Sequence, residues 1–594
     1  MLLNRVTLLL SLSSFTLASA IPARDVSLLS PTRVIVERQA TTTSPIPDGP
    51  CTNGPRTRNC WSDGFSIATD FDAKAPPAGK TVVYNLVITN TTLNPDGHGS
   101  RLAMLINGTF PGPVIRASWG DTLIINVENK LQHNGTGIHW HGLRQLNSCQ
   151  HDGVPGITEC PIAPGKSRQY IFKATQFGTS WYHSHWSAQY ADGVVGTIII
   201  DGPATANYDE DLGVLPLTDW YYLPGFEVNE QAQLSKTGPP LPDNILVNGT
   251  HKNAAGGGAY AKVNVKKGKK YRIRLINTSV DSVFHVSFDG HPFTVMTSDF
   301  VPIRPFVADQ LTLNIGQRYD VVINANQTVA NYWFRVNVGT LCGGNKILNQ
   351  GFQVGAILQY EGAPNANPPD AGGVTMRNHC IDETNLVPFV PNSVPTSILP
   401  TAGNNELSIN HVQDQTTDQL FRWTIDGSTQ IVNWTQPSLK TALENSPNFG
   451  NNSNIYEIAT KDNWYLWWIQ TRTFIPLPHP IHLHGHDFYI LGSGNNVWDQ
   501  TANGLNFNNP TRRDTATLPG GGWLVIAFPA DNPGVWVMHC HIAWHAAQGL
   551  SVQFLERKNE IKGAIGSTTE FSKGCQEWRE YWPNRVYNQT DSGI

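Results

Sequence analysis

Histidines occur in pairs separated by a single residue at four places in the sequence. The pairs are His139/His141, His183/His185, His482/His484 and His539/His541. Side chains two positions apart on a strand point to the same side, so each pair would present both imidazoles together. Imidazole binds Cu, Zn, Fe and Ni, and eight rings could surround one cluster. The four pairs therefore predict a polynuclear metal site.

A second set of metal-binding side chains begins inside the last pair. Cys540 stands between the two histidines of that pair and would point to the opposite face of the strand. His545 follows at loop distance, and His479 stands just before the third pair. A cysteine thiolate with two imidazoles is the ligand set of a blue-copper site. We therefore predict a mononuclear copper centre, and this neighbour favours copper over zinc in the cluster as well.

Strands must position these side chains, and alternating apolar and polar residues predict strands throughout the chain. The clearest cover 81–89, 121–128, 271–276, 318–324, 463–470, 522–528 and 550–555. No long segment has the period of an amphipathic helix, and 53 Gly, 40 Pro and 18 Trp suit turn-rich β domains. The prediction is an all-β fold of Greek-key sandwiches or barrels.

Three parts of the chain resemble one another and predict three domains. Leu105-Ile-Asn-Gly-Thr109 recurs as Leu246-Val-Asn-Gly-Thr250, about one domain length later. Where the outer parts carry histidine pairs, the middle part has Phe284-His285-Val-Ser287 and Arg335-Val-Asn337. The predicted ranges are 41–204 for domain 1, 205–362 for domain 2, 363–400 for a linker and 401–594 for domain 3. Domains 1 and 3 would carry the metal, and domain 2 would mainly space and buttress them.

The start of the chain and its composition bear on its location. Residues 1–20 have the pattern of a secretory signal peptide, and residues 21–40 are either a pro-segment or an N-terminus that is never cut. The sequence has no second apolar run of about 18 residues, so we expect no membrane-spanning helix. A net charge of −5 and a pI near 6.4 offer no basic stripe for nucleic acid. We expect a secreted protein, as a monomer, with a dimer left open.

Asn-x-Ser/Thr sequons and cysteines fit the same compartment. The sequons are at Asn90, Asn107, Asn134, Asn248, Asn277, Asn326, Asn433, Asn451 and Asn588, and which of them carry sugar stays open. Eight cysteines suit an oxidising environment, and if Cys540 holds a metal at least one other thiol is free. Cys51 and Cys60 could close a small loop, and Cys342 with Cys380 could bracket the second junction. Sequence alone does not decide the pairing.

Four motifs carry a resemblance to a known family. They are His139-Trp-His-Gly, His183-Ser-His, His479-Pro-Ile-His-Leu-His-Gly-His486 and His539-Cys-His-Ile-Ala-Trp-His545. Together they resemble the multicopper oxidases, and most of all the laccases of ascomycete fungi, from about Cys51 onward. The resemblance implies three cupredoxin-like domains with a trinuclear copper cluster between the first and third.

The resemblance also implies the ligands of four copper ions per chain. A type 1 copper would lie on His479, Cys540 and His545, a type 2 copper on His139 and His482, and a type 3 pair on His141, His183, His185, His484, His539 and His541. Leu550 stands where related proteins often place a methionine as axial ligand. Because leucine cannot donate to copper, we expect a high-potential type 1 site.

The family's activity follows as an expectation. A phenolic or other aromatic reductant would lose single electrons near an exposed edge of His545, and oxygen would be reduced to water at the cluster. Breakdown of lignin or phenolic compounds would use this chemistry. Asp219 matches a family acid that receives the phenolic proton, although an Asp at a strand end is also a common turn former. Asp152 resembles the acid near the type 2 copper, or else serves an Asp-Gly turn.

Family analogy extends to the tail and the disulfides. Asp591-Ser-Gly-Ile594 is similar to a tail that inserts its carboxylate toward the cluster, and the alternative is a frayed end. The analogy pairs Cys51–Cys60, Cys149–Cys575 and Cys342–Cys380 and leaves Cys160 free.

Two other classes of function stay open, namely another multicopper oxidase and a copper protein that is not an enzyme. A ferroxidase would call for acidic residues around His545, whereas ascorbate oxidases usually carry an axial methionine in place of Leu550. A non-enzymatic copper or electron-transfer protein would need only the blue site and not eight further imidazoles.

Overall fold

The computed structural model describes residues 51–62, 64–339, 342, 346, 352–370, 373–399, 405–413 and 420–594. The predicted signal peptide and pro-segment lie outside these residues. Within the described ranges, no helix is long and apolar enough to cross a membrane.

The first group of strands builds two four-stranded sheets, in the orders β4-β3-β6-β8 and β5-β10-β9-β7, and a small β1-β2 hairpin. Its strands are β1 Cys60–Ser62, β2 Phe65–Ser66, β3 Thr81–Leu93, β4 Arg101–Ile106, β5 Gly112–Ser118, β6 Thr122–Asn129, β7 Ile138–Trp140, β8 Ser167–Lys173, β9 Gly178–Ser184 and β10 Val195–Asp201.

The second group builds a six-stranded sheet, β12-β11-β14-β19-β16-β17, and a five-stranded sheet, β13-β21-β20-β15-β18. Its strands are β11 Glu210–Trp220, β12 Asn244–Val247, β13 Lys262–Val265, β14 Lys270–Asn277, β15 Phe284–Phe288, β16 Phe293–Ser298, β17 Val301–Ala308, β18 Leu311–Leu313, β19 Arg318–Asn324, β20 Asn331–Val338 and β21 Gly355–Tyr360.

The third group repeats the second, with sheets β23-β22-β25-β30-β27-β28 and β24-β32-β31-β26-β29. Its strands are β22 Glu406–Gln413, β23 Phe421–Ile425, β24 Ile455–Ile458, β25 Trp464–Thr471, β26 His479–Leu483, β27 Phe488–Asn495, β28 Thr511–Arg513, β29 Thr515–Leu518, β30 Gly522–Pro529, β31 Gly534–Cys540 and β32 Ser551–Glu556. The predicted all-β class with three cupredoxin-like domains is confirmed, and the sheets are open. The exact domain boundaries stay predictions.

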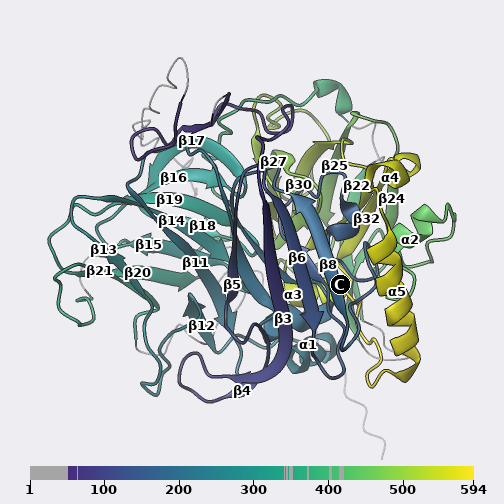
Figure 1. The fold of residues 1–594 in the computed structure, drawn as a ribbon, viewed down its shortest axis with the longest axis horizontal. Coiled ribbons are helices and arrows are strands. Elements are labelled where there is room, and N and C mark those ends of the chain that lie inside the picture. The colour runs from purple at the N-terminus through teal and green to yellow at the C-terminus, as the bar shows by residue number, and fades with distance from the viewer. Residues whose placement is uncertain are drawn as a thin grey trace, which may run out of the picture. The chain divides into compact units, whose positions relative to one another are not determined.

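All seven segments predicted as strands are strands, and the prediction of no amphipathic helix is wrong. The helices are α1 Gly225–Leu234, α2 Ser438–Leu443, α3 Ala543–Ala547, α4 Lys558–Ala564 and α5 Thr569–Tyr581, with 3₁₀ turns η1 Cys149–His151, η2 Ser187–Asp192, η4 Thr396–Ile398 and η5 Trp582–Asn584. The buried residues of α5 are Phe571, Cys575 and Trp578, a helical spacing on one face. In Figure 1 α5 (yellow) runs beside β8 of the first group.

The disulfides correct one predicted pair. Cys51–Cys60 and Cys342–Cys380 are bonded as expected, but Cys575 pairs with Cys160 and not with Cys149. Cys149 is free and buried, and the backbone N–H of Val535 donates to its Sγ at 3.3 Å. The Cys149 thiol therefore lies against β31, whereas Cys160 lies against α5.

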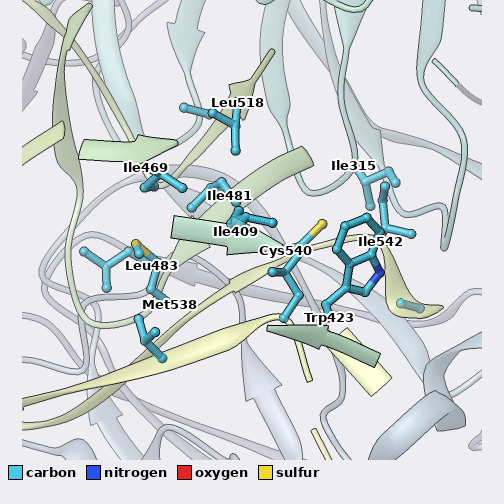
Figure 2. Packing of buried hydrophobic residues seen from close by; sticks show 14 of the residues in the cluster. Ile315, Ile409, Trp423, Ile469, Ile481, Leu483, Leu518, Met538, Cys540 and Ile542 are labelled. Atoms are coloured by element: carbon cyan, nitrogen blue, oxygen red, sulfur yellow. The ribbon is translucent and has the colours of Figure 1, made fainter. Parts of the chain in front are cut away.

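Strand β31 is the element that positions the chemistry. Its sequence, Gly534-Val-Trp-Val-Met-His-Cys540, is rich in β-branched and large apolar residues, and every residue is buried. It lies between β32 and β26 in its sheet. Figure 2 shows Cys540 among apolar side chains of the third group, including Ile481, Ile542 and Trp423.

Candidate metal centre

Strand pairing brings the histidine pairs of each outer group together. His139 on β7 is directly opposite His183 on β9, and His482 on β26 is opposite His539 on β31. Neighbouring strands lie roughly 4.8 Å apart, so imidazoles from paired strands reach one region. The second member of each pair follows two residues later on the same side.

The two outer groups then meet through these rings. His141 Nδ1 lies 3.2 Å from His541 Nε2, and His185 Nε2 lies 3.4 Å from His539 Nε2. His484 Nε2 lies 3.3 Å from the same His539 nitrogen. All eight histidines predicted for a cluster therefore converge, and each exposes at most 4% of its surface.

Hydrogen bonds orient most of these rings through Nδ1. His139 Nδ1 lies 3.0 Å from the Asp152 carbonyl oxygen, and His482 Nδ1 lies 2.8 Å from the Asp514 carbonyl oxygen. His183 bonds in the same way to the carbonyl of its neighbour at 3.0 Å, and His539 does so at 2.9 Å. An Nδ1–H donor leaves the Nε2 lone pair free to bind a metal. The Nε2 atoms of His139, His183 and His482 have no hydrogen-bond partner in the described part of the chain.

Seven of the eight imidazoles have a lowered pKa, which favours the neutral form that metals require. Burial, together with the neighbouring imidazoles, lowers the pKa of His482 and His484 well below the ordinary value. The same causes lower the pKa of His539 to about 4. Buried, neutral nitrogens without protein partners fit a cluster of metal ions.

The mononuclear set forms a compact triangle. Cys540 Sγ lies 3.6 Å from His479 Nδ1 and 3.5 Å from His545 Nδ1, and these two nitrogens lie 3.2 Å apart. Burial raises the pKa of the Cys540 thiol, so a bound cation is needed to hold it as thiolate. His545 exposes only 4% of its surface, which makes the edge predicted for substrate contact small.

Leu550 closes the loop that carries this triangle. Its carbonyl oxygen accepts the Cys540 N–H at 3.1 Å, and its own N–H donates to the His545 carbonyl at 3.0 Å. The leucine side chain is 1% exposed and belongs to the same apolar cluster as Cys540. The loop that joins the ligands Cys540 and His545 to β32 thus ends in a buried apolar side chain without a donor atom.

Asp152 lies between the outer groups. Its Oδ2 is 2.9 Å from His484 Nδ1, and its Oδ1 is 3.2 Å from His139 Nδ1. The next residue, Gly153, has φ +82°, and a Cβ there would stand 1.8 Å from the Ile138 carbonyl oxygen. The two interpretations of Asp152 are therefore compatible, because the Asp-Gly turn positions the carboxylate that contacts the imidazoles.

Asp514 was missed by the sequence analysis. Its Oδ1 lies 3.1 Å from His141 Nε2, so this ring turns Nδ1 toward the cluster. Arg318 on β19 donates to both Asp514 oxygens at 2.7 Å and to the Thr179 carbonyl at 3.1 Å. A fully buried guanidinium of the second group therefore links the first and third groups. The run Arg512-Arg513-Asp514 in a chain with few charges was the available signal.

Comparison with known proteins decides the family. Family models described as multicopper oxidase match residues 87–205, 211–363 and 408–560. The chain belongs to the multicopper oxidases. Its metal is therefore copper, and within the family it is an enzyme of the laccase type, as the relatives indicate.

Relatives of this multicopper oxidase match over nearly its whole length. A laccase from Neurospora crassa is 44% identical over 98% of this chain and 95% of its own. Laccase-1 from Melanocarpus albomyces is 44% identical over 92% of this chain and 90% of its own. The laccase structure from Botrytis aclada has a TM-score of 0.84 at 42% identity, covering 92% of this chain and 100% of that one.

A more distant structural relative has a different role. Fet3p, described as a multicopper oxidase that functions in iron import, has a TM-score of 0.74 at 26% identity. It covers 86% of this chain and 98% of its own.

Two carboxyl groups of this multicopper oxidase lie near the helix that carries His545. Asp219 is 3% exposed, and its oxygens accept the Val280 N–H at 2.8 Å and the Asp281 N–H at 2.9 Å. The Val280 carbonyl in turn accepts the Ala543 N–H of α3 at 2.9 Å. Asp281, which the sequence analysis missed, is more exposed than Asp219. The catalytic role of Asp219 stays a prediction.

The tail of this multicopper oxidase is seated and not frayed. Ser592 is fully buried, and its N–H donates to the Ala547 carbonyl at 2.8 Å. Trp434 Nε1 donates to the Gly593 carbonyl at 3.1 Å, and Ile594 is 3% exposed. Insertion of its carboxylate toward the cluster stays a prediction.

Proposed function

We propose that this enzyme is a laccase that removes single electrons from phenolic and related aromatic reductants and reduces oxygen to water. The observation that carries the proposal is the end of β31, where Cys540 belongs to the mononuclear set and both of its neighbours belong to the cluster. Bound copper would supply the one-electron chemistry at the first site and oxygen reduction at the second. The chain supplies the shortest covalent path between the two.

The residues would divide four copper ions among them. We assign the type 1 copper to His479, Cys540 and His545, the type 2 copper to His139 and His482, and the type 3 pair to His141, His183, His185, His484, His539 and His541. The converging nitrogens and the free Nε2 atoms support this division. Leu550 would stay unbound, which raises the potential of the type 1 site.

Removing an electron from a phenol is easier if its proton leaves as well. Asp219 and Asp281 are the two candidate acceptors, and Asp281 is the more exposed of the two side chains. Burial and the nearby Asp219 raise the pKa of Asp281 well above its ordinary value, which makes it a stronger base. Asp219 would position the Asp281 backbone.

At the cluster, Asp152 is the candidate residue for supplying protons. Its carboxylate contacts rings from both outer groups and is fully buried. We propose that it holds the His484 ring in place and supplies protons for oxygen reduction. With the predicted signal peptide at 1–20, the enzyme would be secreted and would act in lignin or phenolic breakdown.

The deciding experiment is oxygen uptake by the copper-loaded enzyme, with a methoxyphenol and separately with Fe(II), scoring water against peroxide. Fast uptake with the phenol, ending in water, is expected. Preference for Fe(II) would move the assignment to a metallo-oxidase, which the two carboxylates near His545 and the similarity to Fet3p make the second candidate. No uptake despite a blue colour would leave an electron carrier.

The proton acceptor is tested in the same assay. Asp281→Asn should lower kcat/KM for the methoxyphenol by about 10² to 10⁴. Ferrocyanide has no proton to lose, so its oxidation should change little. Equal losses with both reductants would show that the substitution damages the copper site and would contradict the role.

A further inference from the structure

A series of aromatic rings connects the mononuclear set to the surface of the third group. The ring centroid of Trp423 lies 4.7 Å from that of His545 and 5.0 Å from that of His479. Phe421 follows at 5.3 Å from Trp423, and His411 stacks on Phe421 at 5.2 Å with 11° between the planes. The ring contacts therefore run outward from two ligands, along β23 and then β22.

The last ring of this series projects into solvent. Phe474 lies 4.9 Å from His411 with 76° between the planes, and it exposes 85% of its surface. It is the most exposed large apolar side chain in the part of the chain that the structure describes. One exposed apolar side chain needs no explanation by itself. Here, however, Phe474 and His411 form two aromatic walls at nearly a right angle, which we call the aromatic corner.

Hydrogen bonds hold the aromatic corner in one arrangement. Thr473 Oγ1 lies 2.6 Å from His411 Nδ1 and accepts the Ile475 N–H at 3.2 Å. The Arg472 guanidinium donates to Glu406 at 2.6 Å. Both side-chain contacts tie the segment that carries the exposed ring to β22. A ligand that binds there has little side-chain motion to arrest, which favours binding.

His411 also offers a polar atom at the aromatic corner. Burial lowers the pKa of His411 below its ordinary value, so the ring is neutral and one of its nitrogens carries no proton. When Nδ1–H donates to Thr473, the unprotonated nitrogen is Nε2. No hydrogen bond of the described residues engages Nε2. The hydroxyl group of a phenol at the corner can therefore donate to this nitrogen.

The burial of the mononuclear set limits what can reach it directly. His545 is 4% exposed, and Trp423 next to it is 1% exposed. A free phenol can approach so small an edge, whereas a ring carried by a polymer has to stop at the surface. The exposed end of the ring series is uncharged and aromatic, so it suits an aryl ring of such a polymer.

We propose that the aromatic corner is a second docking position, where an aryl ring of a polymeric phenol binds and is oxidised without reaching His545. This inference rests on the proposed laccase function. The phenol loses one electron and its hydroxyl proton and becomes a neutral phenoxyl radical. The proton goes to His411 Nε2. The electron passes through Phe421 and Trp423 to the type 1 site, which is reduced by one electron.

Binding is tested with the copper-loaded enzyme and an aryl group that has no hydroxyl to oxidise. A dimethoxyphenyl group is attached through a short linker to a large dextran, which is immobilised for biolayer interferometry. Phe474→Ala should weaken binding about fivefold, because one aromatic pair contributes about that much. Phe474→Tyr keeps a ring and should bind like the parent. Tyr587→Ala removes another exposed ring, 62% exposed, and is the matched control with unchanged binding.

Turnover is tested with a methoxyphenol on the same dextran and with the free methoxyphenol. Phe474→Ala should raise KM for the grafted phenol about fivefold relative to KM for the free phenol. His411→Phe keeps a ring but removes the proton acceptor. It should lower kcat for the grafted phenol more than for a ferrocene on the same dextran, which loses only an electron.

Two results would overturn the proposal. One is unchanged binding of the dimethoxyphenyl dextran by Phe474→Ala, and the other is an equal rise of KM for free and grafted phenol. Equal losses of kcat with grafted phenol and grafted ferrocene would contradict the role of His411. Oxidation of the free phenol by the parent enzyme tests the laccase function by itself, so the two proposals fail separately.

Discussion

Each cluster histidine that bonds through Nδ1 keeps one nitrogen for the protein and turns the other toward its neighbours. His141 reverses the rule, because Asp514 holds its Nε2 and leaves Nδ1 for the metal. Residue types and spacing predicted the imidazoles, since His-x-His on a strand has one geometric meaning. They assigned no role to Asp514 or Asp281, because neither the charged run at 512–514 nor a single carboxylate names its partner, and each acquires its role only from what packs against it.

Leu550 tunes the mononuclear site. Leu550→Met would place a thioether next to Cys540, where it can donate to the oxidised copper and stabilise it. A tenfold stabilisation corresponds to about 59 mV for a one-electron couple, and we expect the potential to fall by at least that much. Redox titration of the blue absorbance measures it. Leu550→Ile is the control and should leave the potential nearly unchanged.

Asp219 should make folding depend on pH. Burial raises its pKa to about 6 from the ordinary 3.8. Between these values the folded chain holds a proton that the unfolded chain has lost, so stability falls as pH rises through this window. The loss is about 3 kcal/mol at most, because each pKa unit corresponds to about 1.4 kcal/mol.

Asp219→Asn removes the contribution of this carboxyl group to the pH dependence of the unfolding free energy. Denaturant unfolding of the copper-loaded enzyme at pH 4 and pH 7 should show a smaller fall in stability for the variant than for the parent. Parallel profiles for the two proteins would mean that the Asp219 pKa is not raised. The comparison cancels the titration of groups that Asp219 does not influence, whereas the pKa of Asp281, which Asp219 raises, should fall in the variant and reduce the pH dependence further.

At the scale of elements, the strands could be predicted from the sequence, whereas helix α5 and the disulfide that holds it could not. Alternation predicted β3 and β6, since half-buried strands carry a period-two pattern. Helix α5 escaped because only Phe571, Cys575 and Trp578 of its residues are buried, a weak signal among charged neighbours. The disulfide error has the same origin, because Cys149 and Cys160 are close in sequence and only the packing of α5 distinguishes them.

The Cys160–Cys575 bond ties α5 to the first group. Replacing both cysteines by serine should cost about 2 to 5 kcal/mol of unfolding free energy. Chemical denaturation measures the loss, and a non-reducing peptide map should recover the 160–575 linkage. Cys149→Ser is the matched control and should keep that linkage. A Cys149–Cys575 peptide from the parent protein would contradict the structure.

At the scale of the molecule, the second group supplies Arg318, although none of the predicted copper ligands lies in that group. Arg318→Met would leave the buried Asp514 carboxylate without its partner, at a cost of about 3 to 5 kcal/mol. We expect lower unfolding free energy and loss of cluster copper before type 1 copper, measured by metal analysis alongside the blue absorbance.

Arg335→Met is the control for this prediction. Arg335 pairs with Asp289 and Asp370 inside the second group and is more exposed than Arg318, so its loss should cost less and leave the copper content unchanged. Equal effects of the two substitutions would mean that Arg318 contributes no more than an ordinary ion pair.

The pairing of β26 with β31 makes the two copper sites inseparable. Ile481 faces Cys540 across this ladder, and His482 faces His539. A slip of β31 by one residue would turn Cys540 toward the cluster and both flanking histidines away from it. Colour and oxygen consumption should therefore disappear together in any misregistered form. A one-residue insertion or deletion within β31 should therefore not abolish the blue colour while sparing oxygen consumption, or the reverse.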